Sequence, residues 1–117
     1  MILYLHKKCS TCQKALDFLT VKKLGIEVVD ITQRAPSVEE LQRMLKFQNG
    51  NIKKLLNTSG LLYREMNLSK KIAEMSELEV LELLSRHGML VKRPFLLGNS
   101  LGLLGFKEVE WAQSFKC

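Results

Sequence analysis

The chain has little of three things that define whole classes of protein. It contains no apolar run of about 18 residues, the length that a helix needs to cross a bilayer, so we expect no membrane insertion. Its three cysteines are too few and too unevenly spaced for a secreted scaffold held together by disulfides. Aromatic residues make up only 7% of the chain. None of them alternates with the basic residues, which argues against direct binding of nucleic acid.

What is present fits one compact domain. The 117 residues, 46% of them hydrophobic, suffice for a core without covalent staples, so we expect a single domain over residues 1–117. No targeting segment is visible, and a reactive cysteine pair persists in a reducing compartment, so we expect a soluble cytoplasmic protein.

The net charge of +6 is unevenly distributed. Residues 1–60 carry ten lysines and arginines against five acidic residues, whereas residues 61–117 carry eight against seven. An anionic substrate or an acidic partner would be attracted to the N-terminal half. The same excess is also typical of a lysine-rich surface that serves solubility alone.

The most informative motif is Cys9-Ser10-Thr11-Cys12, which follows the short apolar strand Ile2–Leu5 and precedes a helical pattern. The unpaired N–H groups of a helix's first turn favour a thiolate over a thiol. In such settings the pKa of a cysteine falls from about 8.5 to roughly 3.5–7.5. The second sulfur, three residues on, lies within disulfide reach. The motif therefore predicts a redox centre with Cys9 as nucleophile and Cys12 as resolving thiol.

Zinc binding is the alternative interpretation of the same segment. His6, Cys9 and Cys12 would supply three ligands, and a closed structural site would need a fourth from Cys117 or His87. A pair of cysteines with two residues between them serves both chemistries. The lack of a second Cys pair favours redox chemistry, and we expect no bound metal.

Periodicity and turn residues predict the order of elements. The expected strands are residues 2–5, 26–31, 95–97 and 101–104. The expected helices are residues 10–24, 37–49, 76–86 and 107–115, with shorter helical pieces at 52–56 and 60–67. Three capping boxes mark helix starts, at Ser10/Gln13, Ser37/Glu40 and Ser76/Glu79.

This order predicts an α/β fold of the thioredoxin/glutaredoxin type. A β-α-β unit gives two parallel strands, and a C-terminal hairpin completes a mixed four-stranded sheet flanked by helices. A Cys-x-x-Cys beside a βαβ unit is the signature expected of that fold. The region at about 36–88 would be an inserted helical subdomain.

Four segments together carry a resemblance to a known family. They are Cys9–Cys12, Leu55–Gly60 followed by Tyr63-Arg64-Glu65, Lys92-Arg93-Pro94, and Gly105-Phe106-Lys107-Glu108. In order and spacing the chain resembles the arsenate reductase/Spx family over essentially its whole length. The resemblance implies that Pro94 is cis and faces the active cysteine, and that Arg93 binds substrate. Without it, Pro94 would be expected to be trans, since only about 5–6% of X-Pro bonds are cis, and Arg93 would be an ordinary surface residue.

The chain also departs from the family's pattern. Arsenate reductases of the family place three arginines around the nucleophile, and Arg93 matches one of them. Asn57 occupies the position of the first, and Phe106-Lys107 stands where a late Arg-Pro pair is expected. Arg64 and Lys107 are candidate auxiliary cations, although a lysine lacks the planar fork of arginine. We therefore expect weak or no arsenate reduction.

The resemblance leaves an enzyme and a regulator open. As an enzyme, the protein would be a thiol–disulfide oxidoreductase without a bound cofactor, regenerated by glutathione or by a thioredoxin- or glutaredoxin-type reductant. As a regulator like Spx, it would use the same disulfide to control binding to the RNA polymerase alpha subunit. Gly50 lies one residue from the position of the family's polymerase-contacting glycine, but a glycine there would also simply end a helix.

Overall fold

One mixed sheet organises the molecule, described here by a computed structural model for residues 1–21 and 25–115. Its strands are β1 (Ile2–Leu5), β2 (Glu27–Asp30), β3 (Phe95–Leu97) and β4 (Gly102–Leu104), in the order β2-β1-β3-β4. β1 runs parallel to β2 and antiparallel to β3, and β4 runs antiparallel to β3. The predicted mixed four-stranded sheet is confirmed.

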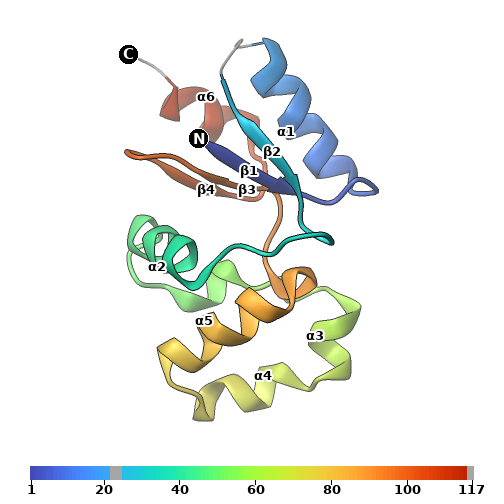
Figure 1. Ribbon diagram of the computed structural model, residues 1–117, viewed down its shortest axis with the longest axis vertical. Coiled ribbons are helices and arrows are strands. Elements are labelled where there is room, and N and C mark those ends of the chain that lie inside the picture. Colours follow the sequence, from blue (N-terminus) through green and yellow to red (C-terminus); the bar gives the residue numbers. More distant parts are fainter. Residues whose placement is uncertain (22–24, 116–117) are drawn as a thin grey trace.

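The helices lie on both faces of the sheet (Figure 1). In chain order they are α1 (Ser10–Val21), α2 (Val38–Phe47), η1 (Ile52–Leu55), α3 (Leu61–Glu65), α4 (Leu68–Lys71), η2 (Ile72–Glu74), α5 (Glu77–Arg86), η3 (Gly88–Leu90) and α6 (Glu108–Ser114), where η marks a 3-10 helix. α1 and α6 cover one face, and α2 lies on the other, beside a helical block that contains α3, α4 and α5. The elements between β2 and β3 are all helical.

The alternation of side chains along the strands divides the core into two layers. Leu3 and Leu5 of β1 pack with Trp111 on the face covered by α1 and α6. Tyr4, between them, joins the opposite layer together with Phe95. Both faces of the sheet are therefore apolar, which explains why β1 reads as an unbroken hydrophobic run.

Two of the predicted capping boxes are confirmed. The hydroxyl oxygen of Ser37 accepts a hydrogen bond from the Glu40 N–H, and the Glu40 carboxylate accepts one from the Ser37 N–H. Ser76 and Glu79 form the same reciprocal pair at the start of α5. Each box satisfies two helix donors that would otherwise lack partners.

The predicted box at Ser10 and Gln13 is wrong, because Ser10 is not the N-cap residue that such a box requires. Ser10 is the first residue of α1, so Cys9 takes the N-cap position and its carbonyl accepts from the Gln13 N–H at 3.1 Å. The Gln13 side chain donates to Asp17 instead (2.9 Å). A cysteine sulfur thus takes the place that a serine hydroxyl was expected to fill.

Positive φ angles account for two boundaries of the helical region. Asn49 and Gly50 have φ values of 58° and 78°, and the Gly50 N–H donates to the Leu45 carbonyl (2.9 Å), so Gly50 does end α2. The single piece expected at 60–67 is shorter than predicted, because Asn67 adopts a φ of 54° between α3 and α4. The expected end of the first helix, at residues 22–24, lies outside the described residues.

Candidate redox site

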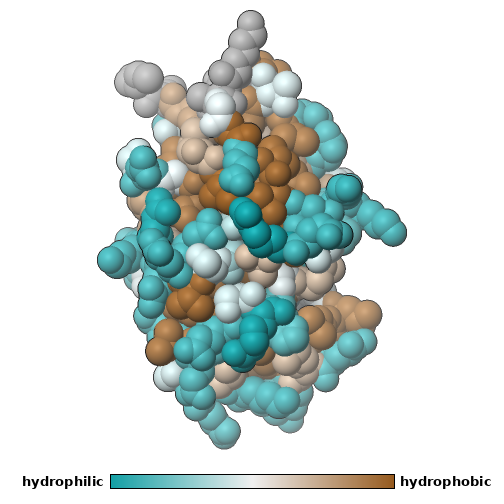
Figure 2. All heavy atoms as spheres, in the orientation of Figure 1, coloured by the Kyte–Doolittle hydropathy of each residue, from teal (hydrophilic) through white to brown (hydrophobic). Residues whose placement is uncertain are grey.

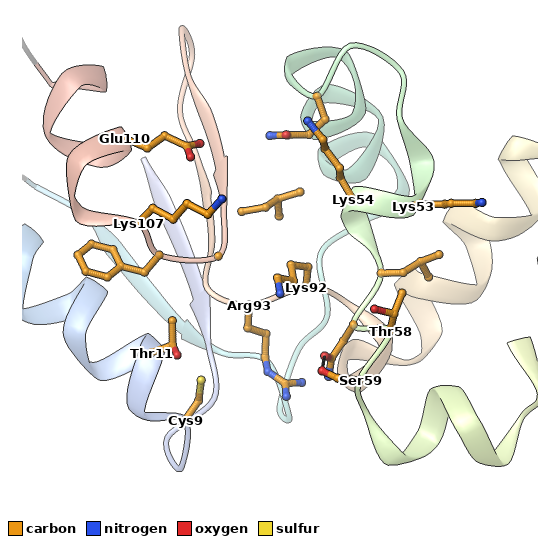
Figure 3. A pocket seen from close by; sticks show the side chains of 16 residues that line it. Cys9, Thr11, Lys53, Lys54, Thr58, Ser59, Lys92, Arg93, Lys107 and Glu110 are labelled. Carbon is orange, nitrogen blue, oxygen red and sulfur yellow. Dashed lines mark hydrogen bonds between the residues drawn. The ribbon is translucent and has the colours of Figure 1, made fainter. Parts of the chain in front are cut away.

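A pocket of about 640 Å³ lies where the sheet meets the helical region (Figure 3). Its walls come from segments far apart in the sequence: Cys9 and Thr11 at the start of α1, residues 56–59 before α3, Lys92 and Arg93 before β3, and residues 104–107 from the end of β4 to the start of α6. All four segments that carry the family resemblance contribute residues to these walls.

Cys9 occupies the N-cap of α1 at one end of the pocket. Its half-buried sulfur accepts a hydrogen bond from the Cys12 N–H at 3.3 Å. Burial alone would raise the pKa of Cys9. The Cys12 amide and thiol, the Thr11 amide and the charge of Arg93 outweigh this effect, so the pKa lies below its usual value. Cys9 is therefore the thiol of the pair that ionises more easily.

Cys12 has the opposite environment. It is 1% exposed and packs in the core layer that contains Leu3 and Leu5. This burial raises the pKa of Cys12 to about 11; the hydrogen bond with the Cys9 sulfur and the charge on that sulfur raise it further, while the His6 backbone and Arg93 lower it. At neutral pH the Cys12 thiol is protonated directly behind Cys9.

Arg93 lies in the same pocket as Cys9. In Figure 3 its guanidinium extends toward the end of the pocket where Cys9 lies. Its Nη1 donates to the Met89 carbonyl at 3.4 Å. The Arg93–Pro94 peptide is cis, as the family resemblance implied, and Pro94 is buried. The charge of Arg93 lowers the pKa of both cysteines.

The other predicted residues divide into two groups. Lys107 and Asn57 both line the pocket. Arg64 is exposed on α3, and neither it nor the buried Pro94 is among the described residues that form the walls. The structure therefore brings Cys9, Arg93 and Lys107 together, with Cys12 behind Cys9, and leaves Arg64 apart.

Three cations of the pocket were not predicted as site residues. Lys53 and Lys54 come from η1, and Lys92 precedes Arg93. The excess of positive charge in the N-terminal half was the available signal for the η1 pair, but no local pattern shows that this pair lines the same pocket as Cys9. With Arg93 and Lys107, the lining residues carry five cations.

Metal binding and membrane insertion find no support in the described residues. Over residues 1–21 and 25–115, no three His, Cys, Asp or Glu side chains group as metal ligands would. His6 Nδ1 instead accepts a hydrogen bond from the Lys8 N–H (3.0 Å). No helix in the same ranges is long and apolar enough to span a bilayer. Cys117, the alternative fourth zinc ligand, lies outside them.

Because the two thiols have opposite environments, Cys9 and Cys12 should titrate at different pH values. Alkylation of Cys9 should rise with pH through a midpoint below that of a free cysteine, while Cys12 should react only at strongly alkaline pH. In Arg93→Gln the loss of positive charge should move the Cys9 midpoint to higher pH. Peptide mass spectrometry of alkylation rates measures both sites.

Arg86→Gln is the matched control, because Arg86 is exposed at the end of α5 and is not among the described residues of the pocket walls. It should leave both titrations unchanged. Equal and high midpoints for the two sulfurs would contradict the assignment of Cys9 as the more acidic thiol.

Comparison with known proteins shows similarity over nearly the whole chain. The ArsC family model matches residues 4–114. The uncharacterized protein YusI of Bacillus subtilis is 40% identical, over 96% of this chain and 95% of YusI. Global transcriptional regulator Spx 2 of Bacillus anthracis is 24% identical, over 94% of this chain and 82% of that protein.

The fold is equally similar to solved structures. The crystal structure of "a possible arsenate reductase" from Streptococcus mutans UA159 aligns with a TM-score of 0.87 at 30% identity, covering 97% of each chain. The sequence match extends from the first strand to the last helix and includes every segment that forms the pocket. The chain belongs to the ArsC family.

Proposed function

We propose that the protein is a thiol–disulfide oxidoreductase of the arsenate reductase-like type. The observation that carries this proposal is the contrast between two thiols one helical turn apart. Cys9 faces a basic pocket with a lowered pKa, and Cys12 is buried behind it with a pKa raised to about 11. Cys9 can attack as a thiolate, and the Cys12 thiol stays protonated until the second step.

The first step is nucleophilic attack by the Cys9 thiolate. On a disulfide substrate, Cys9 forms a mixed disulfide with one sulfur, and the other leaves as a thiolate. On an oxyanion, Cys9 bonds to the central atom and an oxygen leaves as water after protonation. Arg93, at the same end of the pocket, offsets the negative charge that builds up on the reacting atoms.

The second step uses Cys12. The charge on Cys9 and the hydrogen bond between the two sulfurs contribute to the raised pKa of Cys12. Both effects disappear once Cys9 is covalently bonded to the substrate. The pKa of Cys12 therefore falls at the step in which Cys12 must attack as a thiolate. Cys12 then loses its proton and attacks the Cys9 sulfur. This breaks the bond to the substrate fragment, which leaves carrying two electrons, and forms the Cys9–Cys12 disulfide.

Turnover then requires an external thiol. Glutathione, or a thioredoxin- or glutaredoxin-type protein, would reduce the disulfide and restore both thiols, with no cofactor bound to the protein. The Thr11 side chain and Cys9 border the open pocket, so a reductant can approach the outer sulfur while Cys12 stays buried.

Mild oxidation should form a reversible Cys9–Cys12 disulfide and leave the sheet intact. The loop that this bond closes is very short, so its effect on the unfolded chain is small. Intact-mass analysis should show the loss of two hydrogens, and NMR shifts should change mainly near the start of α1 and Arg93. Cys12→Ser should accumulate the mixed disulfide on Cys9, whereas Cys117→Ser should behave like the unaltered protein. A bridge from Cys9 or Cys12 to Cys117 would contradict this mechanism.

Arsenate should be reduced slowly or not at all. Asn57 lines the pocket where the family places an arginine, and its side-chain amide lies 3.5 Å from the Met89 carbonyl. Each lost charge-assisted hydrogen bond costs ~1.5–3 kcal/mol. Two losses, at Asn57 and Lys107, would slow the reaction roughly 10²–10⁴-fold. Thiol-coupled turnover measures this, with reduction of a simple disulfide as the control for active protein. Robust arsenate turnover at ordinary substrate affinity would refute this expectation.

A redox-sensing regulator is the second candidate, favoured by the similarity to a protein named global transcriptional regulator Spx 2. Gly50, however, has a structural role at the end of α2. An oxidoreductase should show no redox-dependent capture by the RNA polymerase alpha subunit. Pull-downs with reduced and oxidised protein, and with the Cys9→Ser variant as the control that cannot switch, test this. Capture by one redox form alone would favour the regulator.

A further inference from the structure

The volume of the pocket beside Cys9 is larger than the thiol reaction at Cys9 requires. Its volume of about 640 Å³ lies within the ~300–1,000 Å³ typical of sites for drug-sized ligands. A single tetrahedral oxyanion, or the two sulfurs of a disulfide, would fill only the end at Cys9. The remaining space is available to the rest of a larger substrate.

The charge of the pocket is also in excess of what the reacting atoms need. Its lining includes four lysines and one arginine, against a single carboxylate, Glu110. Within residues 1–21 and 25–115, none of these five cations has a carboxylate oxygen within 4.0 Å of its nitrogens. Four net positive charges therefore remain for a ligand.

These charges are separated along the pocket. Figure 3 shows Cys9 and Arg93 at one end and Lys54, Lys107 and Glu110 at the other. Lys54 comes from η1 and Lys107 from the turn before α6, so the far end is bounded by two different parts of the fold. A ligand that reaches both ends is elongated, with its reactive sulfur at one end and negative charge at the other.

The cations at the far end of the pocket suit a phosphate. Arginine pairs bidentately with both carboxylate and phosphate, and Arg93, the one arginine among the described residues that line the pocket, lies at the sulfur end beside the reacting atoms. Lysine binds as a point charge and is a common phosphate ligand. The pocket wall also includes Leu56, Leu104 and Phe106, which offer carbon surface to an uncharged arm.

We propose that the pocket accepts the disulfide of a phosphorylated low-molecular-weight thiol, an inference that rests on the proposed oxidoreductase function. The Cys9 thiolate attacks one sulfur of the disulfide and releases the first phosphorylated thiolate. Cys12, on losing its proton, attacks Cys9 and releases the second. The two released thiolates take up two protons, and the two cysteines supply the two electrons and end as a disulfide.

Two probes with the same reactive group test this. Coenzyme A disulfide and pantethine share the disulfide and the uncharged arm, but only the first carries phosphates. Stopped-flow oxidation of the reduced protein, followed by intact-mass analysis, gives the rate for each. We expect coenzyme A disulfide to react about tenfold faster or more at low ionic strength. Added salt should bring the ratio toward one, because the lysines are exposed and therefore screened.

Variants show whether the lysines of the far end cause the difference. In Lys54→Gln/Lys107→Gln the ratio of the two rates should fall toward one. Lys70→Gln/Lys71→Gln is the matched control, because this pair is exposed on α4 and is not among the described residues that line the pocket. It should keep the full ratio. A variant that folds poorly would lower both rates together, so a fall in the ratio reports the loss of charge recognition by the substituted lysines.

The outcomes separate this inference from the function on which it rests. If pantethine oxidises Cys9 as fast as coenzyme A disulfide, the protein is an oxidoreductase without phosphate recognition, and the inference is wrong. Glutathione disulfide, which carries carboxylates, also overturns it if it reacts as fast as coenzyme A disulfide with the same dependence on Lys54 and Lys107. If none of the three disulfides oxidises Cys9, the proposed function itself fails.

Discussion

The hydrogen bond from the Cys12 N–H to the Cys9 sulfur is the interaction on which the site depends. It supplies the side-chain cap of α1, it lowers the pKa of Cys9, and it holds the Cys9 sulfur against the backbone of Cys12. It requires α1 to begin at Ser10. That start is prepared by the turn after β1, where the Cys9 N–H donates to the His6 carbonyl at 3.1 Å. Capping and reactivity are therefore one interaction.

The difference between the two thiols comes chiefly from packing. The charge of Arg93 lowers the pKa of both cysteines, so this charge does not distinguish them. Cys12 lies on the buried face of α1 with Ala15 and Leu19 and loses its contact with water, whereas Cys9 stays at the pocket. The sheet is apolar on both faces, and α1 packs on the core layer of one of them. This packing buries Cys12 and keeps its thiol protonated.

Features set by local chemistry could be predicted from the sequence. The mixed four-stranded sheet followed from the arrangement of strands and helices, and the boxes at Ser37 and Ser76 followed from side chains three residues apart. The box at Ser10 failed because serine is a common N-cap and the sulfur of Cys9 is an uncommon one. The cis peptide before Pro94 came only from the family resemblance. Lys54 and Lys107 line the same pocket because the tertiary fold brings η1 and the turn before α6 to opposite sides of it, and no short window of sequence contains that arrangement.

One wall of the far end of the pocket belongs to a different part of the fold from the reactive end, and this separates part of the recognition from the reaction. Cys9 and Arg93 are held by α1 and by the segment before β3, whereas Lys54 lies on η1, among the helices between β2 and β3. Changes in that helical region can alter what is bound without moving the thiols. The departures from the family's arginine pattern fit this division: under the proposed function, Asn57 and Lys107 would bind one compact oxyanion more weakly while the cysteine pair is kept. The proposed function thus assigns substrate choice to the pocket walls and reactivity to the first turn of α1.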